Sequence, residues 1–113
     1  MILRREKHKA SVIVDAIREK YFTMPTENGF LIATSQGEYT LLLLNDNTEL
    51  YLYRLLDKAE YKKFKKNGLP DGWVLETNPT KMEFAMVYIH SFEKRPTAAM
   101  LQKQVFFAID NNI

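Results

Sequence analysis

The stretch from Glu38 to Leu55, EYTLLLLNDNTELYLYRL, constrains the fold more strongly than any other part of the chain. It contains two apolar runs, 38–45 and 48–55, separated by the polar dipeptide DN. This spacing is typical of antiparallel strands that are joined by a tight turn. The first run is apolar on both of its alternating faces, so we expect it to be a central strand that is covered on both sides.

The second run distributes its side chains unequally between the two faces of the predicted sheet. Leu50 and Leu52 point one way, whereas Tyr51 and Tyr53 point the other way, because successive side chains of a strand alternate. The run FLIAT at 30–34 precedes the hairpin across the short connection SQG. The three runs therefore predict an antiparallel meander.

Two later segments, 72–77 and 82–92, are predicted to form a second hairpin around NPTK. A helix over the later segment is the alternative, but the consecutive Val87, Tyr88 and Ile89 favour a strand. Together with the meander, this hairpin predicts a mostly antiparallel five-stranded sheet.

A helix is predicted near each end of the chain. The last one begins at about Ala98, after Thr97 as a candidate N-cap residue. The first one is expected to end before Pro25, because a residue that precedes proline is driven towards extended geometry. With a short helix at 58–66, the order of elements is α-β-β-β-α-β-β-α, an α+β fold in a single domain of residues 1–113. The first helix carries a stripe of apolar residues at helical spacing, namely Ala10, Ile13, Val14, Ile17 and Tyr21.

The short helix belongs to a lysine-rich segment, LDKAEYKKFKKNGLP. Asp57 and Glu60 form a capping-box pattern at its start, and Gly68 followed by Pro70 ends it. Four of its lysines fall on one side of the helix, where they could neutralise a few phosphates or form a solvated face. The stripe contains no arginine, so bidentate recognition of phosphates or bases is not indicated. These four lysines are Lys58, Lys62, Lys65 and Lys66.

The charge of the chain is unevenly distributed, although its net value is only +2. Residues 1–20 carry six cations against three anions, and residues 57–66 carry five lysines against two anions. A nucleic-acid surface would form if these two basic segments met in space. The cations that complete the lysine stripe in this hypothesis are Arg4, Arg5, Lys7 and Lys9.

The last helix has more apolar surface than one core-facing stripe requires, because Met100 and Phe107 fall on a different side of it. It is either sandwiched within the fold or covered by another chain. Tyr51 and Tyr53 pose the same choice on the sheet: a helix or a partner packs on them, or they stack bases as in some RNA-binding domains. We favour packing, so these four residues form the predicted partner interface.

No residue pattern indicates catalysis, a metal or a cofactor. The four glycines do not form a phosphate-binding loop, and neither His8 nor His90 has a second ligand at i+2 or i+4 that would complete a metal-binding pair. Asp71, Glu76 and Lys81 lack the spacing of a nuclease strand, and their expected role is to keep a sheet edge soluble. Enzymatic activity is therefore uncertain and is the less favoured interpretation.

The preferred hypothesis is a small non-enzymatic protein-binding module, homodimeric or with a protein partner, and the alternative is sequence-independent nucleic-acid binding. The N-terminal residues lack the apolar stretch of a secretory signal. No apolar run reaches the roughly 18 residues that a membrane span needs. We therefore expect a soluble, cytoplasmic protein with no membrane partner.

Overall fold

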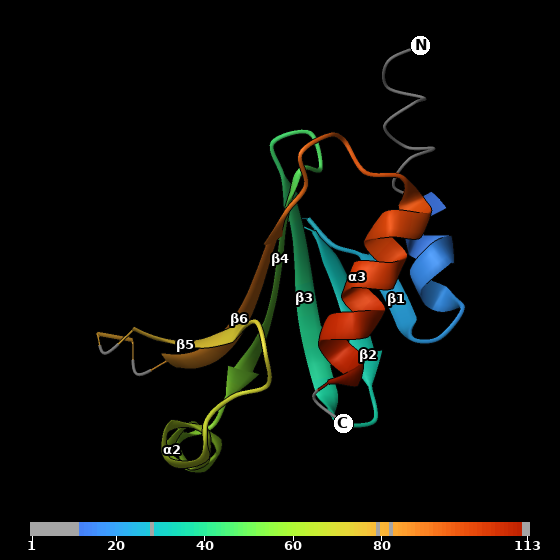
Figure 1. The fold of residues 1–113 in the computed structure, drawn as a ribbon. Coiled ribbons are helices and arrows are strands. Elements are labelled where there is room, and N and C mark those ends of the chain that lie inside the picture. Colours follow the sequence, from blue (N-terminus) through green and yellow to red (C-terminus); the bar gives the residue numbers. More distant parts are fainter. Residues whose placement is uncertain (1–11, 28, 79, 82, 112–113) are drawn as a thin grey trace.

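The computed structural model describes residues 12–27, 29–78, 80–81 and 83–111 (Figure 1). It is an α+β structure in which one antiparallel sheet has six strands in the order β1-β2-β3-β4-β6-β5. The α+β class is confirmed, and the sheet has one strand more than predicted. The strands are β1 (Phe22–Pro25), β2 (Phe30–Thr34), β3 (Gly37–Leu44), β4 (Glu49–Leu56), β5 (Trp73–Asn78) and β6 (Glu83–Ser91). The helices are an N-terminal helix described over 12–18, α2 (Lys58–Asn67) and α3 (Ala98–Asp110).

The extra strand is β1, which lies at the edge of the sheet and pairs with β2. The N-terminal helix ends at residue 18 rather than just before Pro25, so its predicted end was wrong. Arg18 donates from Nε to the carbonyl oxygen of Thr23 at 2.8 Å, which holds the end of the helix against β1. Pro25 is tolerated within the strand because an edge position does not need every backbone N–H for pairing.

The predicted meander and second hairpin are both confirmed. β3 pairs with β2 on one side and β4 on the other, and β5 pairs with β6. The segment that could have been a helix is strand β6, and its pairing with β4 joins the two halves of the sheet. β3 is therefore an interior strand, as its apolar composition predicted.

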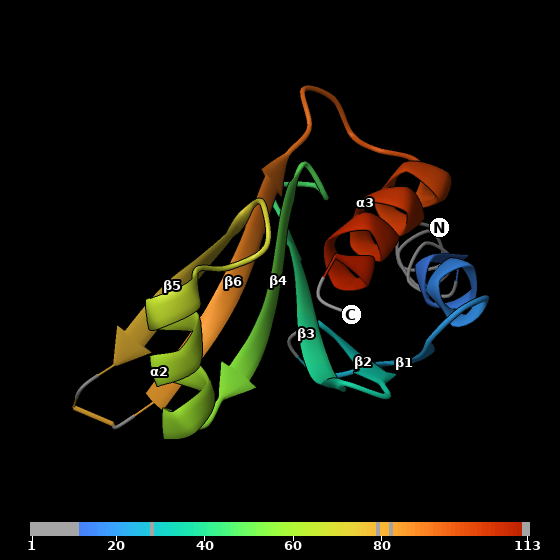
Figure 2. The same ribbon diagram turned by 60° about the horizontal axis from the view of Figure 1, so that its bottom comes forward.

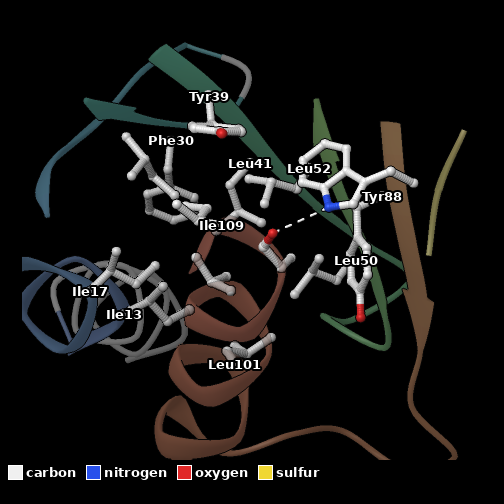
Figure 3. Packing of buried hydrophobic residues seen from close by; sticks show 14 of the residues in the cluster. Ile13, Ile17, Phe30, Tyr39, Leu41, Leu50, Leu52, Tyr88, Leu101 and Ile109 are labelled. Atoms are coloured by element: carbon white, nitrogen blue, oxygen red, sulfur yellow. Dashed lines mark hydrogen bonds between the residues drawn. The ribbon is translucent and has the colours of Figure 1, made fainter. Parts of the chain in front are cut away.

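One face of the sheet carries the core, into which α3 and the N-terminal helix pack (Figure 3). Trp73 donates its indole N–H to the carbonyl oxygen of Ala108 at 3.2 Å, shown dashed, and so links β5 to α3. Gln102 of α3 donates from Nε2 to the carbonyl oxygen of Ala16 at 2.6 Å. The fully buried residues of this face and its helices include Ile17, Ile32, Leu41, Leu50, Leu52, Met86, Leu101, Val105 and Ile109.

The predicted capping of α2 is confirmed. The side chain of Asp57 accepts from the backbone N–H of Glu60, and the side chain of Glu60 accepts from the backbone N–H of Asp57. At the other end Gly68 has a φ of 86° and donates to the carbonyl oxygen of Phe64. The positive φ explains why glycine stands where the helix stops.

The α2 helix contacts the same face of the sheet as α3, but at the other end of β4 and β6 (Figure 2). Tyr61 stacks on Phe84 with ring centroids 4.5 Å apart. Arg54 pairs through Nη2 with Glu60 at 2.7 Å, and both side chains are partly shielded from solvent. Phe84 and Arg54 share the core-facing side of their strands with Leu50, so α2 does not reach the opposite side.

The opposite face of the sheet is not covered by any helix in the described part of the chain. Leu42 is half-buried and Leu44 is exposed, so the expectation that β3 is covered on both sides was wrong. The physical reason is that the described helices all contact one face. Alternation along a strand shows which side chains share a face, but not where distant helices pack.

Candidate protein-binding surface

The uncovered side of the sheet, here called the open face, crosses all six strands without interruption. The strand registers place Met24, Leu31, Thr40, Tyr53, Val87 and Val74 opposite one another in one row across the sheet. Leu42, Tyr51 and Ile89 form the next row, which crosses β3, β4 and β6. Side chains directly opposite each other in antiparallel strands are about 5 Å apart and touch. The face is therefore one contiguous surface.

This surface is strongly apolar. The described residues include nine exposed large hydrophobic side chains, and six of them point from the open face. Leu55 is the most exposed, at 67%. Single exposed apolar residues are normal, but a contiguous group of them marks an interaction surface. The six residues are Phe22, Met24, Leu44, Leu55, Val74 and Ile89.

Three adjoining hollows lie along the part of the open face that is formed by β2, β3, β4, β6 and β5. The central one has a volume of about 310 Å³. A second, of about 300 Å³, lies towards β2 and β3 and shares Tyr53 and Leu55 with it. A third, of about 220 Å³, lies towards the end of the β5–β6 hairpin and shares Leu55, Glu76 and Glu83 with it. Leu55 borders all three, so they form one groove, here called the Leu55 groove. The central hollow is lined by Leu42, Tyr51, Tyr53, Leu55, Glu76, Glu83, Ala85 and Val87.

The charged side chains of the open face are all acidic in the described strands. Glu76 and Glu83 are diagonal neighbours across β5 and β6, at about 7–8 Å. Glu38 borders the hollow at the other end of the Leu55 groove. Glu49 follows on β4, opposite Leu44, and accepts a hydrogen bond from the side chain of Asn45. By strand alternation, no described strand residue that points from this face is lysine or arginine. Arg54, which points from the other face, also lines the hollow at Glu38, where its guanidinium pairs with Glu60.

Tyr51 and Tyr53, two of the predicted interface residues, lie in the middle of the open face and are half-buried by their neighbours. Met100 and Phe107 are exposed on the outer side of α3, which packs on the opposite face of the sheet. The structure therefore does not bring the two predicted pairs together. The sequence did contain the signal for Leu55, because that residue shares the alternation of Tyr51 and Tyr53.

The sequence left open whether the fold itself or another chain covers the extra apolar surface of α3, and the described fold covers only part of it. This helix packs on the sheet beside the N-terminal helix (Figure 2), and Phe106 makes an edge contact with Tyr21 at a centroid distance of 5.8 Å. Its outermost pair, Met100 and Phe107, remains exposed at 48% and 52%. The extra apolar surface predicted from the sequence is thus only partly absorbed by the described fold.

A cluster of polar side chains connects the segment that follows the N-terminal helix to the C-terminal end of α3. Lys20 lies 2.6 Å from a carboxylate oxygen of Asp110, and the Tyr21 hydroxyl donates to the other oxygen. Burial and the hydrogen bond to Asp110 raise the pKa of Tyr21 to about 12. Burial alone would raise the pKa of Asp110, but the hydrogen bonds from Lys20 and Tyr21 outweigh it, so that pKa is lowered.

The lysine stripe of α2 points into solvent. Lys58, Lys62, Lys65 and Lys66 are exposed, and none forms an ion pair with a described acidic residue. The Lys65 ammonium lies 5.9 Å from the centre of the Tyr61 ring. The open-face tyrosines lie on the other side of the sheet, so stripe and tyrosines do not form one surface. The remaining predicted cations, Arg4, Arg5, Lys7 and Lys9, lie outside the described residues.

The two histidines were not expected to be ligands. His90 is half-buried beside Phe92, with ring centroids 4.6 Å apart, and His8 lies outside the described residues. Within the described ranges, no group of three or more histidine or acidic side chains is placed to hold a metal ion. Asp71, Glu76 and Lys81 are exposed around the β5–β6 hairpin.

Comparison with family models, with curated protein sequences and with solved structures finds no match to this chain. Among the residues that the structure describes, no helix has the length and apolar character needed to cross a membrane. The functional interpretation therefore depends on the open face and its chemistry.

Proposed function

We propose that this chain is a non-enzymatic protein-binding module that holds a partner on the open face of its sheet. The observation that supports the proposal is the contiguous apolar surface with six exposed large side chains. Covering such surface is favourable by roughly 25 cal/mol per Å² of apolar area removed from water. A partner that covers the open face therefore gains the same driving force that the helices gain on the core face.

The size and residue types of this surface are more typical of a site that binds a protein than of a site that binds a small molecule. Small-molecule sites are single concave pockets of about 300–1,000 Å³. The three hollows of the Leu55 groove, at about 220, 300 and 310 Å³, lie below or at the lower limit of this range and are spread side by side across several strands. Tyr51 and Tyr53 at the centre are of a residue type that is enriched, with tryptophan and arginine, among the residues that contribute most binding energy at protein interfaces.

Site-specific crosslinking tests this proposal. We expect a photoreactive phenylalanine derivative at Leu55 to form protein adducts in the native cells, because its ring points from the centre of the groove. The same residue at Lys63, which is exposed on α2, is the matched control. Adducts that are equally frequent at both positions, or absent at Leu55, would contradict the proposal.

Self-association is the second part of the proposed function, and the outer side of α3 is the surface we assign to it. Met100 and Phe107 are two helical turns apart on the same side of the helix, so two copies of α3 can pack this pair against each other across a two-fold axis. This arrangement leaves the open face of each copy free for a partner.

Nucleic-acid binding through the α2 stripe is retained as the alternative function, because four exposed lysines without described acidic partners favour it. Such binding would depend on phosphate neutralisation and would weaken steeply with salt. A cytoplasmic location stays an expectation from the sequence.

A further inference from the structure

We propose that the partner held on the open face is a cationic amphipathic helix of another protein, seated along the Leu55 groove. The helix presents bulky apolar side chains to the groove and lysine or arginine near each of its ends. This inference rests on the proposed function, because it names the chemistry of the partner that the open face binds.

The shape of the groove gives the first argument. It runs from Leu31 and Glu38, past Tyr53 and Leu55, to Glu76 at the β5 edge. It crosses five strands spaced by about 4.8 Å, so its length is about 19 Å. A helix that rises 1.5 Å per residue covers this length in about 13 residues. Such a helix places apolar side chains at i, i+3, i+4 and i+7 into successive hollows.

Charge complementarity gives the second argument. Glu38 stands at one end of the groove, and Glu76 and Glu83 stand at the other. Among the described residues that line the three hollows, Arg54 beside Glu38 is the one cation, and its guanidinium already pairs with Glu60 at 2.7 Å. A partner with basic residues at both ends pairs with these carboxylates, whereas an acidic partner meets like charges, which costs several kcal/mol.

The same charges argue against other occupants of the groove. In a two-fold dimer through this face, the carboxylates of one copy would meet the carboxylates of the other, and Arg54, the cation beside Glu38, is already paired with Glu60. Nucleic acids and anionic lipid surfaces would meet the same repulsion. A separate basic segment of a partner protein is the occupant that satisfies both the apolar floor and the acidic ends.

The inference is tested by selecting binders from a displayed library of random 16-residue peptides. We expect the native protein to select peptides with apolar residues at helical spacing and a net positive charge. The affinity of these peptides should fall about 100-fold in the variant Glu76→Lys/Glu83→Lys, at about tenfold for each reversed charge, and should weaken with added salt.

A matched control keeps the change in net charge constant. Asp71→Lys/Glu93→Lys reverses two exposed acidic residues that lie in connections outside the strands. This variant should bind the selected peptides within about threefold of the native affinity. Unfolding midpoints of both variants, measured in urea, show whether each is folded under the binding conditions.

The outcomes separate this inference from the proposed function. If the selected peptides carry no positive charge but no longer bind the variant Leu55→Asp, the inference that the partner is cationic is overturned. The open face then remains a protein-binding surface. A native dimer that Leu55→Asp converts into a folded monomer would overturn the inference in favour of a second copy. If no selected peptide loses binding in Leu55→Asp, the inference of a cationic helix is overturned as well. The proposed function would then depend on the crosslinking result alone.

Discussion

The indole nitrogen of Trp73 lies 3.2 Å from the carbonyl oxygen of Ala108 and donates a hydrogen bond to it. Ala108 lies in the last turn of α3, where backbone carbonyls lack partners within the helix. A side chain from the edge strand β5 thus satisfies the end of a helix that lies 35 residues away in the sequence. This contact joins the second hairpin to the core.

We predict that Trp73→Phe lowers the free energy of unfolding by about 1–3 kcal/mol. The change removes the donor and leaves both the carbonyl and part of the indole volume without a partner. Val74→Ala, at the exposed neighbouring position on the open face, should cost much less, within about 0.5 kcal/mol. Urea denaturation of the two variants measures the difference, and equal costs would contradict the role of the hydrogen bond.

Two glycines with the same backbone angle should respond differently to alanine. Gly68 and Gly72 both have φ near 86°, which disfavours any side chain. An added Cβ at Gly72 would lie 2.6 Å from a ring carbon of Tyr88, whereas at Gly68 it would meet nothing within 4 Å. We expect Gly72→Ala to destabilise the fold by at least about 1 kcal/mol more than Gly68→Ala. Thermal unfolding of the pair tests this.

Stability should depend on the ionisation of the cluster formed by Tyr21 and Asp110. The pKa of Tyr21 is about 12 in the folded state and about 10 in a free tyrosine. Its contribution to stability is therefore complete below pH 10 and is lost as the pH rises towards 12. Because the pKa of Asp110 is lowered by folding, its contribution is present above its unfolded pKa and is lost as the pH falls through the folded value.

The comparison of wild type with Tyr21→Phe isolates the alkaline effect. We expect the difference in unfolding free energy between the two proteins to shrink between pH 10 and pH 12, because only the wild type loses a protonated hydroxyl there. Chemical denaturation across this range provides the measurement. A difference that stays constant with pH would show that the hydroxyl does not contribute through its protonation.

The outer side of α3 gives a direct prediction about oligomeric state. Phe107→Asp should convert a native dimer into a folded monomer, because it places a charge in the centre of the proposed contact while leaving the buried stripe of the helix intact. Light scattering reports the mass, and circular dichroism reports folding. A native protein that is already monomeric at high concentration excludes self-association through α3.

The alternative function predicts a different response. If the α2 stripe binds nucleic acid, Lys62→Glu/Lys65→Glu should abolish retention on an oligonucleotide column, and native retention should fall steeply with salt. Lys81→Glu/Lys94→Glu changes the net charge equally but leaves the stripe unaltered, so it should retain binding. Absence of native retention at low salt rules the alternative out.

The features that could be predicted from the sequence are those in which neighbouring residues determine the structure. The capping box of Asp57 and Glu60 begins α2, and Thr97 accepts from the backbone of Met100 at the start of α3. The placement of Tyr51 and Tyr53 on one face follows from strand alternation alone. Each of these depends on chain geometry over at most a few residues.

The existence of strand β1 and the location of the partner surface could not be predicted, because both depend on contacts between different elements, which the spacing of residues does not encode. Phe22–Pro25 has too few residues to show a strand pattern, and it becomes a strand because β2 supplies its hydrogen bonds. Met100 and Phe107 were grouped with the tyrosines because all four are apolar or aromatic, but the sheet separates the two pairs.

Residue spacing along the chain is sufficient to predict the α+β class, the hairpins and the alternation that divides the strands into two faces, because backbone geometry repeats over two to four residues. Which of these faces remains open depends on the tertiary structure. Both faces of β3 are apolar, and the choice between them depends on where α2, α3 and the N-terminal helix pack. That choice exposes Leu55 together with Glu76 and Glu83, and so creates an apolar surface with acidic ends.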